Sequence, residues 1–202
     1  MEKQFATIIS KIFNPLIIAF FFLMITFNLQ FYFATSIPEN ARWMILGLVA
    51  ITTFILPGLL SNILSAMLKR NAILSGKDGR LIPLAITAVF YLFTYHLLDR
   101  ISLSPIFNLF VLGMASLAVV SIFIIMVKNV SLFMLAAGAL TGGFIGLHFT
   151  LGVNLNFFIL GSLLLAGLIG FSRLSLEKHQ PMDIYIGFIM GVLVMMLHYL
   201  YL

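Results

Sequence analysis

The residues best suited to chemistry lie between the last two apolar runs of the chain. Ser172 and Arg173 are followed by His179, and Asp183 comes four positions after the histidine. If the last apolar run is helical, His179 and Asp183 lie one turn apart on the same face. The carboxylate then holds the imidazole in one tautomer, and the imidazole can attack as a nucleophile. Arg173 offers a planar fork of donors suited to phosphate, so the cluster predicts a phosphate site.

The same cluster has a simpler interpretation as a polar loop at a membrane surface. Basic residues are common at the ends of membrane spans, and Arg173 and Lys178 alone carry little information. A histidine and an aspartate at helical spacing beside them favour the functional interpretation.

Composition defines the class of protein that holds this cluster. Of the 202 residues, 62% are hydrophobic and 8% are charged, and the mean hydropathy is +1.18. These values exclude a soluble domain of this length and predict an integral membrane protein. The chain has no cysteine, which excludes disulfides, iron–sulfur clusters and thiolate zinc sites. The pI is near 9.7, but no basic stripe or basic helix exists, so we expect no nucleic-acid partner.

Continuous apolar runs long enough to span a bilayer predict about seven transmembrane helices in an all-α bundle. The runs cover residues 15–34, 43–67, 81–98, 106–127, 132–150, 155–171 and 184–202. They are continuous rather than alternating, which argues against a β-barrel. Pro83 and Pro181 fall where a first helical turn accepts proline. No stretch is polar enough to be a linker, so we predict a single domain over residues 1–202.

Alternation of the connections places most basic residues on the face that holds the cluster. With seven spans, segments 1–14, 68–80, 128–131 and 172–183 share that face. They carry nine of the eleven Lys and Arg residues: Lys3, Lys11, Lys69, Arg70, Lys77, Arg80, Lys128, Arg173 and Lys178. The positive-inside rule then predicts that this face is cytoplasmic.

The arrangement Ser172-Arg173-x5-His179-x3-Asp183, followed by Gly187, resembles the third signature of the type 2 phosphatidic acid phosphatases. These are helical membrane relatives of the vanadium haloperoxidases. The stretches 11–15 (KIFNP) and 77–83 (KDGRLIP) are similar to a short bacterial branch of that family. The resemblance covers essentially the whole chain. It implies phosphoryl transfer that needs neither a metal ion nor a cofactor. His179 would be the nucleophile, Asp183 would orient it, and the phosphate ligands would be Arg173, Ser172, Ser131, Lys77 and Arg80.

The second signature of that family contains a serine and, two positions later, a histidine that acts as general acid. Here Ser131 is present and Phe133 stands in the histidine's place. Loss of a general acid typically costs about 10²- to 10⁴-fold in rate. A pyrophosphate substrate suffers less, because its leaving group is itself a stabilised phosphate anion. The resemblance therefore implies activity on lipid or polyprenyl pyrophosphates before lipid monophosphates.

Two other hypotheses remain open. In the first, the chain is not an active phosphatase but a catalytically silent relative of that family, which binds lipids or serves as a subunit of a membrane complex. Alternatively, His96, His148 and His198 converge at the opposite ends of their spans and bind a metal, haem or quinone, although none has a second ligand at paired spacing. On the resemblance we expect the inner membrane of a bacterium, with family precedent placing many such sites on its extracytoplasmic side.

Glycines recur every fourth residue along two of the predicted spans. Gly138, Gly142 and Gly146 lie in the fifth span, and Gly187 and Gly191 lie in the seventh. Such stripes permit close contact between helices in a membrane. Packing the fifth span against the seventh would bring Ser131 toward His179.

Overall fold

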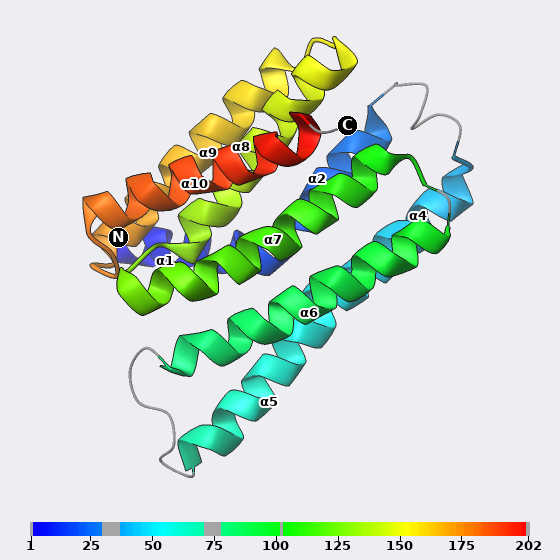
Figure 1. Ribbon diagram of the computed structural model, residues 1–202. Helices are drawn as coiled ribbons and strands as arrows, with labels where there is room; N and C mark the ends of the chain where they lie inside the picture. The colour runs from blue at the N-terminus through cyan, green and yellow to red at the C-terminus, as the bar shows by residue number, and fades with distance from the viewer. Residues whose placement is uncertain (1, 30–36, 71–77, 102, 201–202) are drawn as a thin grey trace. The chain divides into compact units, whose positions relative to one another are not determined.

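A computed structural model describes residues 2–29, 37–70, 78–101 and 103–200. Within these ranges every regular element is helical, which confirms the all-α prediction (Figure 1). The helices are α1 (Glu2–Ile12), a 3₁₀ turn η1 (Pro15–Ile17), α2 (Ile18–Asn28), α4 (Glu39–Val49), a π-helical turn η2 (Ala50–Ile55), α5 (Leu56–Arg70), α6 (Asp78–Arg100), α7 (Pro105–Val127), α8 (Leu132–Leu151), α9 (Asn156–Ser175) and α10 (Pro181–Leu200).

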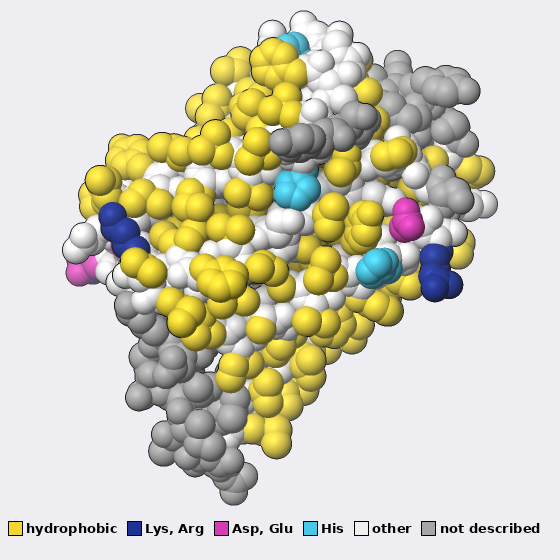
Figure 2. All heavy atoms as spheres, viewed as in Figure 1, with side chains coloured by type: hydrophobic (Ala, Val, Ile, Leu, Met, Phe, Trp, Pro, Cys, Tyr) yellow, Lys and Arg dark blue, Asp and Glu magenta, His cyan; other side chains and the backbone are white. Residues whose placement is uncertain are grey.

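In the described ranges, six helices are long and apolar enough to cross a membrane. They run over Glu39–Leu64, Leu81–Arg100, Pro105–Val127, Leu132–Leu151, Asn156–Ser175 and Pro181–Leu200. A seventh span results if Glu2–Ser10 and Pro15–Asn28, which meet at a bend of 43°, are counted together. Residues 30–34 of the predicted first span lie outside the described residues. Figure 2 shows the apolar covering, with hydrophobic side chains over most of the visible face and charged side chains near helix ends. These are the helices of an integral membrane protein.

The contacts between residues divide the chain into two compact units. Unit 1 comprises Met1–Ile18 and Phe123–Leu202, and unit 2 comprises Ala19–Ile122. The single domain expected from the sequence stays a prediction.

Unit 2 has an aromatic core and one irregular helix. Phe22 of α2 stacks on Phe110 of α7, with 3.6 Å between the ring centroids. The π-helical turn η2 lies just before Pro57, and the Leu56 N–H bonds to the Ile51 carbonyl. This wider turn fits a proline that would otherwise clash with the preceding turn of an α-helix.

The two prolines predicted for first helical turns have different positions. Pro181 is the first residue of α10, as predicted. Pro83 lies inside α6, because that helix begins at Asp78 rather than at Leu81. The placement of Pro83 in a first turn was wrong, since the polar residues 78–80 extend the helix upstream of the apolar run.

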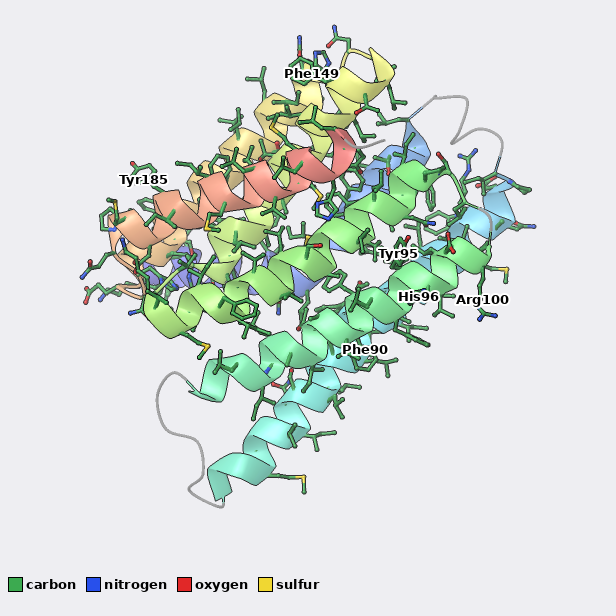
Figure 3. The ribbon with its side chains drawn as sticks, viewed as in Figure 1. Phe90, Tyr95, His96, Arg100, Phe149 and Tyr185 are labelled. Carbon is green, nitrogen blue, oxygen red and sulfur yellow. The ribbon has the colours of Figure 1, made fainter. Side chains whose placement is uncertain are left out.

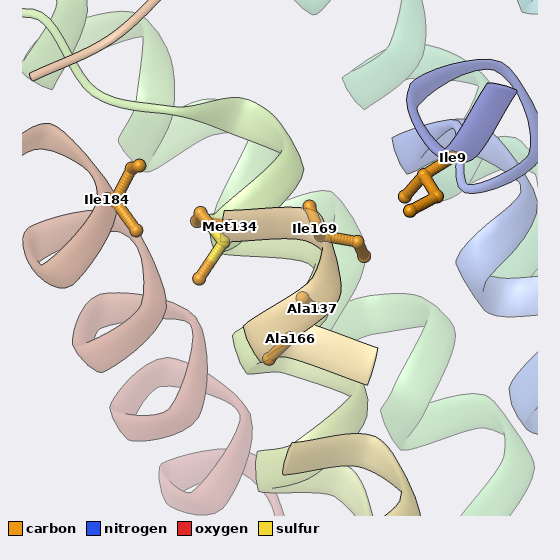
Figure 4. Packing of buried hydrophobic residues seen from close by; sticks show 6 residues of the cluster. All are labelled: Ile9, Met134, Ala137, Ala166, Ile169 and Ile184. Atoms are coloured by element: carbon orange, nitrogen blue, oxygen red, sulfur yellow. The ribbon is translucent and has the colours of Figure 1, made fainter. Parts of the chain in front are cut away.

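Unit 1 is built on α8, against which α9 and α10 both pack, and α1 lies on α9. The contact between α8 and α10 is the most extensive, and we call it the seam, formed around Gly138, Gly142, Gly187 and Gly191. A Cβ at Gly142 would lie 2.6 Å from the Val192 carbonyl oxygen. The glycines are therefore required for this approach, and the predicted packing of these two helices is confirmed. Figure 4 shows the apolar cluster beside the seam, formed by Ile9, Met134, Ala137, Ala166, Ile169 and Ile184.

Candidate phosphate site

The end of α9 directs the chain sharply toward α10. The Glu177 N–H donates to the Leu174 carbonyl at 2.8 Å, and the Lys178 N–H donates to the Arg173 carbonyl at 3.2 Å. This is the hydrogen-bond pattern of a Schellman motif, in which glycine usually takes the left-handed position. Here Glu177 takes it, with φ of 53°, at a cost of about 1–2 kcal/mol. The strained turn brings His179 to the start of α10.

The first turn of α10 is closed by its own aspartate. Asp183 is the third residue of the helix, and its Oδ2 accepts the Gln180 N–H at 3.2 Å. This is half of a capping box, which satisfies a backbone donor that the helix itself cannot. Asp183 therefore has a structural role whether or not it acts on the imidazole.

His179 lies two residues before α10 and is not part of the helix. Even so, its Nδ1 lies 3.6 Å from Asp183 Oδ2, and the two side chains are only 8% and 12% exposed. This separation brings the imidazole beside the carboxylate and is longer than a hydrogen bond. The capping backbone N–H and the imidazole therefore face the same carboxylate oxygen.

Ser131 joins this end of α10 to the start of α8. Its N–H donates to the Asp183 carbonyl at 3.3 Å, and it occupies the cap position before α8. The residue is completely buried. Among the described residues, no hydrogen-bond partner reaches its Oγ. A buried hydroxyl beside a helix N-terminus is suited to an anion, because the first N–H groups of a helix have no acceptor within it.

Arg173 is held between α1 and α8. Its Nη1 donates to Ser10 Oγ at 3.1 Å, and its Cζ lies 4.2 Å from the centroid of the Phe133 ring. Only 7% of the residue is exposed. A buried cation–π contact is worth about 2 kcal/mol. Phe133 thus supports the arginine.

Helix α1 packs on α9 at this end of unit 1, and the sequence did not reveal this contact. Ser172 Oγ donates to the Ala6 carbonyl at 2.6 Å, and Lys3 pairs with Glu177 at 3.5 Å. The hydroxyl of Ser172 thus faces α1, and its assignment as a phosphate ligand stays a prediction. Ser10 was missed. Its only signal was a polar position among Ala6, Ile9 and Phe13 on one side of an amphipathic segment.

The remaining predicted ligands are not placed at this site. Lys77 lies outside the described residues. Arg80 belongs to the first turn of α6 in unit 2. Their assignment as phosphate ligands stays a prediction. Within unit 1, contacts join Ser131 and His179 to Asp183, and Phe133 to Arg173.

The alternative of a histidine-bound metal gains no support from the described ranges. No group of three or more His, Cys, Asp and Glu side chains in them is arranged to hold a metal ion. Nδ1 of His148 faces the Val153 carbonyl at 2.6 Å, and Nδ1 of His198 faces the Val194 carbonyl at 2.8 Å. His96 is exposed near the end of α6, one turn before Arg100, which is also exposed (Figure 3).

An apolar groove opens between α9 and α10, next to the connection that carries His179. Its volume is about 380 Å³, and the wall and floor residues are Met134, Leu163, Ala166, Gly167, Gly170, Phe171, Leu174, Pro181, Ile184, Tyr185 and Phe188. The groove exists because α9 and α10 contact each other sparsely while both pack on α8.

Comparison of the chain with models of protein families, with curated proteins and with solved structures gave no match. The resemblance to the membrane phosphatases therefore depends on the residues quoted above.

Proposed function

We propose that this protein binds the phosphate of a membrane lipid at the cluster of Ser131, Arg173, His179 and Asp183, and that His179 is a metal-independent nucleophile toward it. The observation that carries the proposal is the convergence of two motifs separated by forty residues of sequence. Ser131 bonds to Asp183, and Phe133 stacks on Arg173. A buried hydroxyl, a guanidinium and an imidazole beside two helix N-termini suit a bound phosphate.

The reaction proposed for a lipid pyrophosphate has two steps. An imidazole nitrogen of His179 forms a bond to the terminal phosphorus, and the bond from that phosphorus to the bridging oxygen breaks. The lipid monophosphate leaves with the electron pair. Water then attacks the phosphohistidine, which releases inorganic phosphate and a proton and restores the imidazole. With Phe133 in the place of the acid, we expect pyrophosphates to react faster than monophosphates.

A second candidate is a catalytically silent lipid-binding protein or a subunit of a membrane complex. It is favoured by the present partners of Arg173, since Ser10 and Phe133 take up much of the guanidinium. It is also favoured by the capping role of Asp183, which explains that residue without any chemistry.

Phosphate release by the purified, reconstituted protein separates the two candidates. The substrates are a polyprenyl pyrophosphate and the matching monophosphate, tested with the native chain and with His179→Ala and Phe133→His. We expect pyrophosphate hydrolysis that His179→Ala abolishes and a gain on the monophosphate in Phe133→His of up to about 10²-fold. Activity that appears only in Phe133→His identifies the native protein as silent.

His198→Ala is the matched control, because that histidine lies at the other end of α10 and faces its own helix backbone. Phosphate release that persists unchanged in His179→Ala removes His179 as the nucleophile. Equal rates on the two native substrates contradict the preference for pyrophosphate.

We also propose that the protein lies in a bacterial inner membrane. Thiol labelling tests on which side of that membrane the site lies. The chain has no cysteine, so Lys178→Cys gives a single labelling position beside His179. Labelling of intact cells by an impermeant thiol reagent indicates an extracytoplasmic site, and labelling only after permeabilisation indicates the cytoplasmic side that the charge count favours.

A further inference from the structure

We propose that the groove between α9 and α10 holds the hydrocarbon chain of a phosphorylated membrane lipid. The proposal relies on the proposed function for the identity of the head group. It adds the place where the hydrophobic part of that ligand lies. The groove volume, about 380 Å³, is within the range of about 300–1,000 Å³ of small-molecule sites.

The surroundings of the groove favour lipid as the occupant. Both walls are membrane-spanning helices, and their neighbouring outward side chains are exposed hydrophobic residues such as Leu164, Leu168 and Ile189. The groove therefore opens toward the hydrocarbon of the bilayer. On α9 it extends from Leu174 to Leu163, a rise of ~16 Å. This is close to half of the ~30 Å hydrocarbon core, the depth of one lipid chain.

The end of the groove near the connection from α9 to α10 suits an anionic head group. Leu174 and Pro181 form that end, and the chain between them carries the exposed Lys178. Tyr185 lies on the first turns of α10 with an exposed side chain that points outward (Figure 3). A lysine at this level attracts anionic lipids. A chain in the groove thus places its phosphate beside the connection that carries His179.

The glycines of α9 provide a way to fill the groove without disturbing the helix. A Cβ added at Gly167, which lines the groove, meets nothing within 4 Å, and the same holds for Gly161, which does not line it. Gly167→Leu should therefore occupy the groove. Gly161→Leu makes the same change of residue on the same helix outside it.

Quenching of tryptophan fluorescence by dibrominated phosphatidic acid tests the occupant. Trp43 is the only tryptophan, so Trp43→Phe gives a silent background. Into it we would introduce either Leu163→Trp, in the groove, or Leu164→Trp, which is adjacent at the same depth but outside the groove. His179→Ala is included so that hydrolysis cannot consume the probe, and the protein is reconstituted in phosphatidylcholine with a minor fraction of brominated lipid.

We expect position 163 to report about fivefold enrichment of phosphatidic acid over its mole fraction. Position 164 should report none. Gly167→Leu should abolish the difference, Gly161→Leu should keep it, and Lys178→Gln should reduce it. Equal quenching at 163 and 164 overturns the proposal. Equal enrichment of dibrominated phosphatidylcholine overturns selection of an anionic head group.

Absence of quenching at 163 by either lipid also overturns the proposal and indicates a protein occupant such as a second copy of the chain. Because Leu163→Trp itself adds bulk to the groove, a second measurement uses native Leu163. Phosphatidic acid retained per protein is determined by native mass spectrometry, and Gly167→Leu should retain less than Gly161→Leu. Enrichment without phosphate release would refute the proposed hydrolysis alone, and hydrolysis without enrichment would refute the groove proposal alone.

Discussion

Helix α10 has two faces that differ in how tightly they are packed. On the seam, Gly187 and Gly191 bring the backbone of α10 against that of α8. On the other face, Ile184, Tyr185 and Phe188 leave an open groove against α9. The tight face positions Asp183 against Ser131. The contrast indicates that close packing maintains the geometry of the candidate site, while the other face leaves a groove.

The largest effect is expected from breaking the seam. A Cβ at Gly191 would overlap the Leu135 carbonyl oxygen and approach Ala139 N to 2.8 Å. Both are backbone atoms, which cannot move without separating the helices. Gly191→Leu should destabilise the protein by ~3 kcal/mol or more, measured as a loss of folded protein and a lower melting temperature in detergent. Gly167→Leu in the groove should have a melting temperature within a few degrees of that of the native protein. An equal loss of stability in Gly191→Leu and Gly167→Leu would contradict the contrast between the two faces of α10.

A smaller effect is expected from a single methyl group on each face. A Cβ at Gly187 would lie 2.9 Å from the Ser131 carbonyl oxygen, whereas a Cβ at Gly170 would meet Ile184 and Met134 at 3.5 Å, an ordinary contact. Gly187→Ala should therefore cost about 1–3 kcal/mol. Gly170→Ala should be neutral or stabilising by up to ~1 kcal/mol, because alanine favours a helix. Thermal melting of the two variants would refute this account if Gly187→Ala were the more stable.

The smallest effect separates the two roles of Asp183. Asp183→Asn keeps an oxygen that can accept the Gln180 N–H but removes the charge near His179. Asp183→Ala removes both, and should lower stability by about 1 kcal/mol. If the carboxylate acts only as a cap, Asp183→Asn keeps native stability and native phosphate release. If the charge also serves the imidazole, Asp183→Asn keeps stability and loses activity.

Much of the fold followed from sequence, because continuous apolar runs and glycine stripes are strong signals. The packing of α8 on α10 was predicted from the glycine stripes, which are Gly138, Gly142 and Gly146 in one span and Gly187 and Gly191 in the other. The contact between Phe133 and Arg173 was not. It depends on tertiary packing between segments far apart in sequence, which no local pattern reports.

The role of α1 was also beyond prediction. The segment has one broad apolar face that is only partly covered, with Ala6 and Ile9 buried and Phe5 and Ile8 exposed. Its pattern indicates an interfacial helix but does not say which side is covered by protein. That Ser10 contacts Arg173 depends on the position of α1 on α9. The strained conformation of Glu177 likewise had no signal in a residue type that rarely adopts positive φ.

The most direct test of the central claim is capture of the phosphohistidine. The reconstituted protein is mixed with a lipid pyrophosphate, the reaction is stopped with alkali, in which phosphohistidine survives, and peptides are analysed by mass spectrometry. Our account predicts one added phosphate on His179 in the native protein and in the His198→Ala control, and none in His179→Ala. Phosphate on another residue, or inorganic phosphate released with no labelled His179 at any time point, would contradict it.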